Sequence, residues 1–167
     1  MTSAQNRSEG GETAPGALAG VRVLDLTSVV LGPLATQILG DYGAEIIKVE
    51  SPEGDLARAS GVSLHPGMSS IFLAINRNKR SIAVDLKSAE GREILQRLVP
   101  GADVLVHNMH VAAIERLGFG YKAVAERNPR IVYCAATGFG QGGPDRSPHI
   151  AHRRFAAQGA EQDAAVA

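Results

Sequence analysis

Short apolar runs rich in β-branched residues alternate with helical segments along most of this chain. The first run covers residues 21–26, the second covers residues 44–50, and a helical segment over residues 34–39 separates them. Apolar runs of this length are typical of buried strands. A helix between two neighbouring strands carries the chain back to the starting edge of the sheet, so the strands lie parallel. The sequence therefore predicts a β-α-β unit, with Gly32 and Pro33 in the turn after its first strand.

The same alternation continues along the rest of the chain. Ser88 is expected to cap a helix, because its hydroxyl can accept a free amide of the first turn, and Ile94, Leu95 and Leu98 give that helix one apolar face. The remaining predicted elements are strands over residues 81–86, 104–106 and 131–135 and short helices over residues 112–117 and 121–127. This order predicts an α/β fold with an open, largely parallel sheet flanked by helices.

Composition divides the chain into one domain between two tails. Residues 1–17 are rich in Gly, Ser, Thr and Glu, which predicts a disordered tail. Residues 18–146 hold the alternating elements and form the predicted domain. Residues 147–167 lose the pattern, so we expect a divergent, poorly ordered tail and a sheet that is incomplete.

Charge and hydropathy argue against several classes of partner. The chain has 17 Lys and Arg residues and 17 Asp and Glu residues, so neither nucleic acid nor a membrane surface is an expected partner. No stretch approaches the ~20 apolar residues of a membrane span. Residues 1–15 lack the apolar segment of a signal peptide, which makes the cytoplasm the expected location. Cys134 lies in an apolar run and is expected to be a buried hydrophobe rather than a catalytic thiol.

Residues 138–143 follow a predicted strand and carry the pattern G-x-G-x-x-G. In a dinucleotide site these glycines admit a pyrophosphate to the start of a long helix. Here Pro144 and Pro148 oppose such a helix, so the motif favours a glycine-rich loop over a nicotinamide or flavin site. Loops at this end of a strand are nevertheless where open α/β sheets bind their ligands.

Other polar residues have both functional and structural interpretations. Arg77, Lys79 and Arg80 predict either a solvated turn or a clamp on a phosphorylated ligand, which Lys48, Lys87 and Arg116 would join. His107 and His110 have no cysteine or paired carboxylate beside them, so no metal site is predicted. Asp25, at a strand end, is expected to cap the turn that follows.

Six blocks of this sequence, in family order, resemble the class III CoA-transferases, which include formyl-CoA:oxalate and carnitine CoA-transferases. The resemblance covers residues 18–146. The blocks are residues 18–27 with Gly32-Pro33, residues 40–50 with Pro52, Gly54-Asp55 and Arg58, residues 76–81 with 85–87, residues 102–108, residues 115–121, and residues 128–133 with 138–144.

The resemblance implies a fold and an activity that no single motif shows. Members transfer CoA from an acyl-CoA to a carboxylic acid, and a minority racemise or epimerise acyl-CoA. The implied fold is an open, Rossmann-like α/β domain with a smaller second domain, in chains that interlock as a homodimer. The implied substrates are coenzyme A carried as acyl-CoA and a carboxylic acid acceptor, with no metal cofactor.

The resemblance also assigns CoA contacts to three stretches of the chain and one arginine. They are Val30 and Leu31 at the CoA entrance, Val84, Asp85, Leu86 and Lys87 along the nucleotide end, Asn108, Met109 and His110 against the backbone of the cofactor, and Arg116 at its phosphates. Met109 and His110 replace an aromatic residue and a basic residue or glycine that the family often has there. Ser51 stands where some members have an arginine. These departures bear on affinity and donor choice rather than on the fold.

The nucleophile of the family is an aspartate in a Gly-Asp context that forms covalent thioester adducts. It follows a further helical segment after the glycine-rich loop. In this sequence Asp145 precedes the place of that segment, and Asp163 follows Gln162, so no catalytic residue is assigned. We therefore expect a truncated or frameshifted fragment that is catalytically incomplete alone.

Three alternatives stay open. The chain is a CoA-binding or regulatory module without turnover, or it is half of a split enzyme whose partner supplies the aspartate. The third is the acyl-CoA racemase branch, which requires a His-Asp pair after the loop. His149 and His152 lie there, and neither has an adjoining aspartate.

Overall fold

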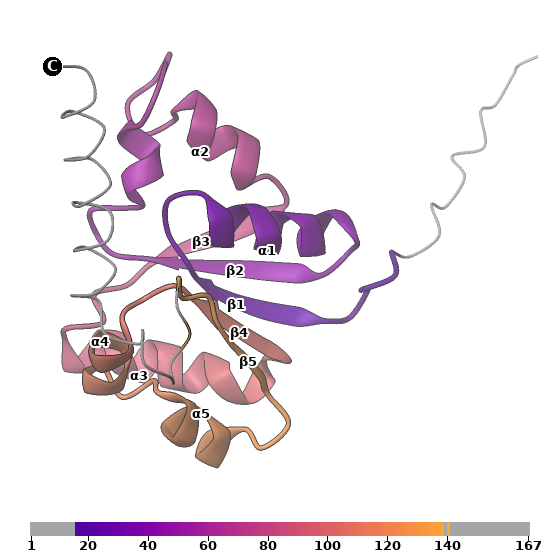
Figure 1. Ribbon diagram of the computed structural model, residues 1–167, viewed down its shortest axis with the longest axis vertical. Coiled ribbons are helices and arrows are strands. Elements are labelled where there is room, and N and C mark those ends of the chain that lie inside the picture. The colour runs from indigo at the N-terminus through magenta and orange to yellow at the C-terminus, as the bar shows by residue number, and fades with distance from the viewer. Residues whose placement is uncertain (1–15, 139, 141–167) are drawn as a thin grey trace, which may run out of the picture.

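The computed structural model describes residues 16–138 and residue 140 (Figure 1). The expected tails lie outside these residues, apart from Gly16 and Ala17. Of the glycine-rich loop, Gly138 and Gly140 are described. The later residues that the sequence singles out also lie outside the described part; they are Asp145, His149, His152 and Asp163.

Strands and helices alternate throughout the described part of the chain. In chain order they are β1 (Arg22–Leu26), α1 (Leu31–Asp41), β2 (Glu45–Glu50), the 3₁₀ helix η1 (Leu56–Ala59), α2 (Ser70–Ile75), β3 (Lys79–Ala83), α3 (Ala89–Leu98), the 3₁₀ helix η2 (Val99–Gly101), β4 (Val104–His107), α4 (Val111–Arg116), α5 (Tyr121–Arg127) and β5 (Val132–Ala135).

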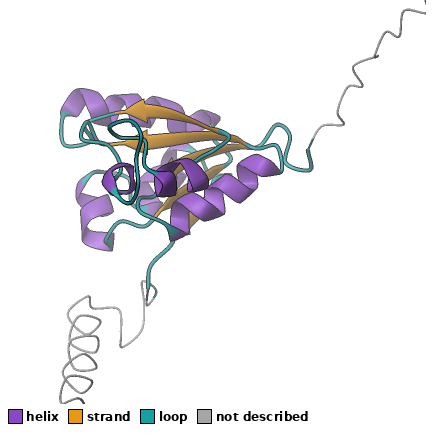
Figure 2. Ribbon diagram, turned by 90° about the horizontal axis from the view of Figure 1, so that it is seen from above, coloured by secondary structure: helices purple, strands orange, loops and turns teal. Residues whose placement is uncertain are grey.

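The strands form one parallel sheet in the order β3-β2-β1-β4-β5. β1 lies between β2 and β4, so that Leu24 is opposite both Ile47 and Leu105. The chain builds outward from β1 to β3, then returns to the other side of β1 for β4 and β5. The strand order therefore reverses between β1 and β4. The described sheet and its flanking helices confirm the predicted α/β fold (Figure 2).

The two faces of the sheet are covered by different helices. Figure 1 shows α1 and α2 on one face and α3, α4 and α5 on the other. The second face carries the main hydrophobic core, whose buried residues are Leu24, Leu26, Val49, Val84, Leu95, Val99, Ala102, Leu105, Ile114, Phe119, Val124 and Ile131. The apolar cluster beside α1 is smaller and consists of Val23, Ala44, Ile46 and Val106.

The start of α3 is fixed by two neighbouring residues. The Oγ of Ser88 accepts a hydrogen bond from the amide of Gly91 at 2.9 Å, so the predicted cap is confirmed. Gly91 itself allows the helix to approach the preceding turn, since a Cβ there would lie 1.9 Å from the carbonyl oxygen of Asp85. The turn over residues 84–88 is therefore held closely against the first turn of α3.

The bounds of β3 differ from the prediction. The strand covers Lys79–Ala83 rather than residues 81–86, because Lys79 pairs with Ile46 and Ala83 pairs with Glu50 at the end of β2. Residues 84–86 have left the sheet, although the amide of Val84 still donates to the carbonyl of Glu50. Hydrophobic pattern alone does not show where the neighbouring strand ends.

Two apolar residues expected to be buried are exposed. Ile94 is 42% exposed on α3, whereas Leu95 is fully buried, because only one side of this short helix faces the core. Cys134 is also exposed. It lies on β5 at one end of the sheet order, on the face opposite Tyr133, and α1 lies over β1, β2 and β4 instead.

The contrast between the two neighbouring residues of α3 gives a stability prediction. Leu95→Ala should lower the free energy of unfolding by about 2–5 kcal/mol, because it leaves a cavity in the main core. Ile94→Ala is the matched control and should cost less than about 1 kcal/mol, since its side chain is half exposed. Urea unfolding of both purified variants measures the difference, and equal losses would contradict the burial of Leu95.

Candidate functional site

The carboxyl ends of β1, β2 and β4 surround a cleft of about 230 Å³. Its lining comes from the last residues of β1 and β2 and from residues that follow β1, β2 and β4; they are Leu26, Thr27, Ser28, Lys48, Val49, Glu50, Ser51, Gly54, Asp55, Leu56 and Met109. Open parallel sheets bind ligands outside the carboxyl ends of the strands where the strand order reverses. In this sheet that place lies between β1 and β4. The strand order and the cleft therefore both indicate a candidate ligand site at this edge of the sheet.

Residues 27–30, the β1–α1 loop, connect β1 to α1 at this edge. The amide of Thr27 donates to Oδ1 of Asp25 at 2.9 Å, which confirms that Asp25 caps the turn. Nζ of Lys48 donates to the carbonyl oxygen of Thr27 at 2.8 Å. The amide of Val29 donates to Oδ1 of Asp55 at 3.0 Å. Side chains from β1, β2 and the loop after β2 thus hold the first half of the β1–α1 loop.

Asn108 joins the two strands between which the sheet order reverses. Its Oδ1 accepts from the amide of Ser28 at 3.0 Å, and its Nδ2 donates to the carbonyl oxygen of Ser28 at 2.9 Å. The side-chain amide therefore bonds both backbone groups of one residue. It ties the end of β4 to the β1–α1 loop.

Three ion pairs lie beneath α1 and α2 on the same face of the sheet. Lys48 pairs with Asp55 at 2.8 Å, and both side chains are 1% exposed. Lys79 pairs with Asp25 at 2.9 Å and is equally buried. Glu50 receives two hydrogen bonds from the guanidinium of Arg58, at 2.6 and 2.7 Å.

Burial and interactions with neighbouring groups shift the pKa values of Lys79 and Glu50 in opposite directions. Burial lowers the pKa of Lys79, because its ammonium loses hydration, and the charge of Asp25 opposes this effect. Burial alone would raise the pKa of Glu50. Hydrogen bonds from Arg58, Ser81 and the amide of Asp55 outweigh it and lower the pKa of Glu50 to about 2. Glu50 is therefore a structural carboxylate that stays ionised.

The three neighbouring cations of residues 77–80 do not form a clamp. Lys79 is buried against Asp25. Arg77 pairs with Asp41 at 2.6 Å, and Arg80 pairs with Glu45 at 2.9 Å, with both arginines largely exposed. The predicted clamp of three cations was wrong, because Lys79 is buried against Asp25 and cannot reach a ligand. The solvated turn describes Arg77, whereas Arg80 is exposed within β3.

The structure places the CoA contacts implied by the resemblance around this edge. Of these residues, Met109 lines the cleft, half-buried, and Asn108 bonds the β1–α1 loop beside it. Val30 and Leu31 are 44% and 79% exposed at the start of α1. His110 is the N-cap of α4, and its Nδ1 accepts from the amide of Ala112.

The other implied contacts lie further from the cleft lining. Val84 is buried, and Leu86 is partly buried against the core. Asp85 and Lys87 are exposed in the turn after β3, where Oδ1 of Asp85 accepts from the amide of Lys87. Arg116 is exposed at the end of α4, with its Nε on the carbonyl oxygen of Ala112. Residues 84–87 therefore follow β3 at its carboxyl end, and Arg116 lies at the last residue of α4.

Sequence reasoning assigned Met109 but missed the contacts that build the rest of the cleft wall. It did not predict the ion pair of Lys48 with Asp55 or the hydrogen bonds of Asn108 with Ser28. One signal was available, since Lys48 interrupts the apolar run of β2 and Asp25 interrupts that of β1. A charged residue within a buried strand requires a buried partner.

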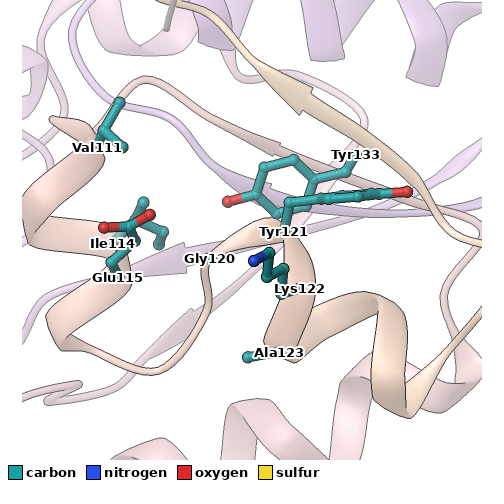
Figure 3. Close-up of a pocket in the computed structure, with 8 residues that line it drawn as sticks. All are labelled: Val111, Ile114, Glu115, Gly120, Tyr121, Lys122, Ala123 and Tyr133. Atoms are coloured by element: carbon teal, nitrogen blue, oxygen red, sulfur yellow. The ribbon is translucent and has the colours of Figure 1, made fainter.

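A second cavity of about 370 Å³ lies between α4 and α5. Figure 3 shows Val111, Ile114 and Glu115 on one side of it and Tyr121 and Tyr133 on the other. The hydroxyl of Tyr133 donates to the carbonyl oxygen of Phe119, and burial raises the pKa of this hydroxyl to about 12. None of the CoA contacts implied by the resemblance lines this cavity.

Neither a metal site nor a membrane span is found within the part of the chain that the structure describes. Over residues 16–138 and 140, no group of three or more His, Cys, Asp or Glu side chains is placed to hold a metal ion. In the same residues, no helix has the length and apolar character that crossing a membrane requires.

The parallel sheet and its edge cleft define an open α/β domain with a cleft near the point where the strand order reverses. The model of CoA-transferase family III matches residues 18–152. The chain therefore belongs to CoA-transferase family III.

Curated relatives and solved structures agree with this family. A formyl-CoA:oxalate CoA-transferase of Streptomyces coelicolor is 47% identical over 126 residues, which are 75% of this chain and 31% of that protein. A succinyl-CoA:glutarate CoA-transferase of Homo sapiens is 46% identical over 128 residues, 76% of this chain and 29% of that protein. The crystal structure of a CAIB/BAIF family protein from Brucella suis is 39% identical, with a TM-score of 0.76, over 80% of this chain and 36% of that chain. The chain spans about a third of the length of these relatives.

Glu50 provides a pH prediction. Its folded-state pKa of about 2 lies below the ordinary value of 4.5. Its contribution to stability is therefore fully present above about pH 5 and is lost as the pH falls towards 2. A shift of this size corresponds to about 3 kcal/mol.

Glu50→Gln should lower the free energy of unfolding at pH 7 by a comparable amount and flatten its decline between pH 5 and pH 2. Glu93→Gln removes an exposed carboxylate of α3 for which residues 16–138 provide no ion pair. This control should change the free energy of unfolding at pH 7 by less than about 0.5 kcal/mol. Urea unfolding at several pH values measures both variants. If the free energy of unfolding of Glu50→Gln declined between pH 5 and pH 2 as steeply as that of the unsubstituted chain, the ion pair of Glu50 with Arg58 would be contradicted.

Proposed function

We propose that this chain supplies the CoA-binding part of an enzyme that transfers CoA from an acyl-CoA to a carboxylic acid. The observation that carries the proposal is the position of the CoA contacts implied by the resemblance. They follow β1, β3 and β4 at a single edge of the sheet, on both sides of the point where the strand order reverses. Relatives over the matched segment are named as CoA-transferases acting on formyl-CoA with oxalate and on succinyl-CoA with glutarate.

In the proposed complex, CoA extends along this edge. Val30 and Leu31 flank the entrance of the thioester arm, and their exposure leaves them free for contact. Asn108, Met109 and His110 face the middle of the cofactor. Lys87 and Arg116 are exposed cations that can approach phosphates, while residues 84–86 pass the nucleotide. The β1–α1 loop and the turn before α3 supply the rigid walls.

The transfer step itself is proposed to need a carboxylate nucleophile outside the described residues. The resemblance places that aspartate after the glycine-rich loop, and no described carboxylate takes its role. The carboxylates in the cleft wall, Glu50 and Asp55, are held in ion pairs. We therefore propose that residues 16–138 bind CoA and that transfer requires a further segment of protein.

The proposed assembly is a homodimer, as the resemblance implies, and its proposed location is the cytoplasm, as expected from the sequence. Apolar side chains that are 38–48% exposed on α1 and α2 support burial against more protein. They are Leu34, Ile38, Ile71 and Leu73.

CoA binding can be tested with two matched arginines. Arg116 and Arg127 are both exposed, and each donates to the carbonyl oxygen four residues earlier in its helix. Only Arg116 is proposed to contact a phosphate. Arg116→Ala should weaken CoA binding about tenfold, which is the loss of one charge-assisted hydrogen bond. Arg127→Ala should leave the affinity within about twofold, a free-energy change of about 0.4 kcal/mol.

Isothermal titration of CoA into the chain and both variants measures these affinities. Equal effects of the two substitutions would argue against a phosphate contact at Arg116. No binding by the unsubstituted chain would overturn the proposed function. Binding without transfer from formyl-CoA or succinyl-CoA would agree with a nucleophile that a further segment of protein supplies.

A further inference from the structure

Val29 has a backbone conformation that its side chain disfavours. Its φ is +72°, in the left-handed region, which is a genuine outlier for a β-branched residue. The side chain is 45% exposed, so burial of the valine does not explain the conformation. Backbone strain of this kind persists only where the surroundings impose it, and it is frequent at ligand sites.

Asp55 is the group that imposes the conformation at Val29. Its Oδ1 accepts the amide of Val29 at 3.0 Å and the amide of Ala57 at 2.9 Å. Its Oδ2 lies 2.8 Å from Nζ of Lys48. The carboxylate is buried, with Oδ1 accepting two amides and Oδ2 in an ion pair with Lys48, so it has little freedom to move. The conformation of Val29 is therefore tied to the buried ion pair.

The residues before Val29 are fixed as firmly. Asn108 bonds the amide and the carbonyl oxygen of Ser28, and Lys48 bonds the carbonyl oxygen of Thr27. On the other side, Gly32 packs directly on Thr27, since a Cβ at Gly32 would lie 2.4 Å from Cβ of Thr27. The loop is held from β2, from the segment after β2 and from β4.

Val30 and Leu31 follow these anchored residues, at the end of the loop and the start of α1, with exposed side chains. We propose that Asp55 and Asn108 are positioning residues that hold the β1–α1 loop in its CoA-binding conformation before CoA arrives. This inference rests on the proposed function, and it adds what the anchors do. A binding loop that is already ordered loses less conformational freedom on association, so its affinity is higher.

Asp55 and Asn108, the anchors of the loop, would give different results if their role were purely structural. In that case the anchors stabilise the fold, and a change in loop freedom alters the unfolding temperature without altering the affinity for CoA. Loss of the anchors separates the two roles. Substitution of Val29 is the control for its own side chain, because glycine adopts a φ of +72° without strain and leaves the anchors in place.

Val29→Gly should bind CoA within about twofold of the unsubstituted chain, because the bonds from Asp55, Asn108 and Lys48 still hold the loop, and its unfolding temperature should be no lower than that of Val62→Gly. Val62 is an exposed loop valine with an ordinary φ, so the control measures the general effect of a valine-to-glycine change. Val29→Asn is the second variant. It also removes the valine side chain, but asparagine tolerates the left-handed conformation and restricts the loop more than glycine. Its affinity should stay within about twofold of the unsubstituted chain, about 0.4 kcal/mol.

Hydrogen exchange of the unsubstituted chain without ligand gives an independent readout. The amides of Ser28 and Val29 should be protected before CoA is added, because both have buried or bridging acceptors. The double variant Lys48→Met with Asp55→Ala removes both charges of the pair, so no unpaired ion is left in the core. In it, the amide of Val29 should exchange faster and CoA should bind more weakly.

Each outcome decides the matter. Weaker binding by the double variant with near-normal glycine and asparagine variants, together with protected amides, supports pre-organisation by the anchors. Loss of affinity in both Val29 variants would mean that the valine side chain contacts CoA, which overturns the proposal. Unprotected amides in the free chain, or normal affinity in the double variant, also overturn it. If the unsubstituted chain binds no CoA, the proposed function fails first, and this role fails with it.

Discussion

The buried ion pair between Lys48 and Asp55 connects β2, the β1–α1 loop and the start of η1. Both side chains are 1% exposed, and charges removed from water destabilise a protein unless their partners are complete. Lys48 meets this requirement with Asp55 and the carbonyl oxygen of Thr27. Asp55 meets it with Lys48 and the amides of Val29 and Ala57. Each bond that satisfies a charge also fixes a loop at the edge of the sheet.

The two faces of the sheet consequently have different roles in the structure. The face under α3, α4 and α5 is closed by apolar side chains, whose burial is non-directional and supplies stability. The face under α1 and α2 holds Asp25, Lys79, Glu50 and Arg58 in directional bonds. Directional bonds tolerate little displacement, so this face determines where the loops lie. Precision at the cleft therefore comes from the charged face, and cooperativity of folding comes from the apolar one.

The sequence predicted the sheet because its strands are short apolar runs separated by helices. It also predicted the cap at Ser88, because a helix start needs an acceptor for its free amides. The end of β3 and the exposure of Cys134 were missed, since both depend on which strand or helix lies alongside. The clamp at residues 77–80 was wrong for a related reason. Asp25, Asp41 and Glu45 are far from these cations in sequence, and only the fold brings them together.

Every anchor of the proposed CoA-binding edge lies within the described residues. Lys48, Asp55 and Asn108 hold the β1–α1 loop, and Ser88 with Gly91 holds the turn that carries Lys87. The geometry of this edge thus depends on contacts inside a segment that is about a third of the length of its relatives. The proposed nucleophile depends on sequence beyond that segment. Under the proposed function, CoA binding and group transfer therefore depend on different parts of the protein, because the contacts that hold the proposed binding edge lie within residues 16–138 and the proposed nucleophile does not.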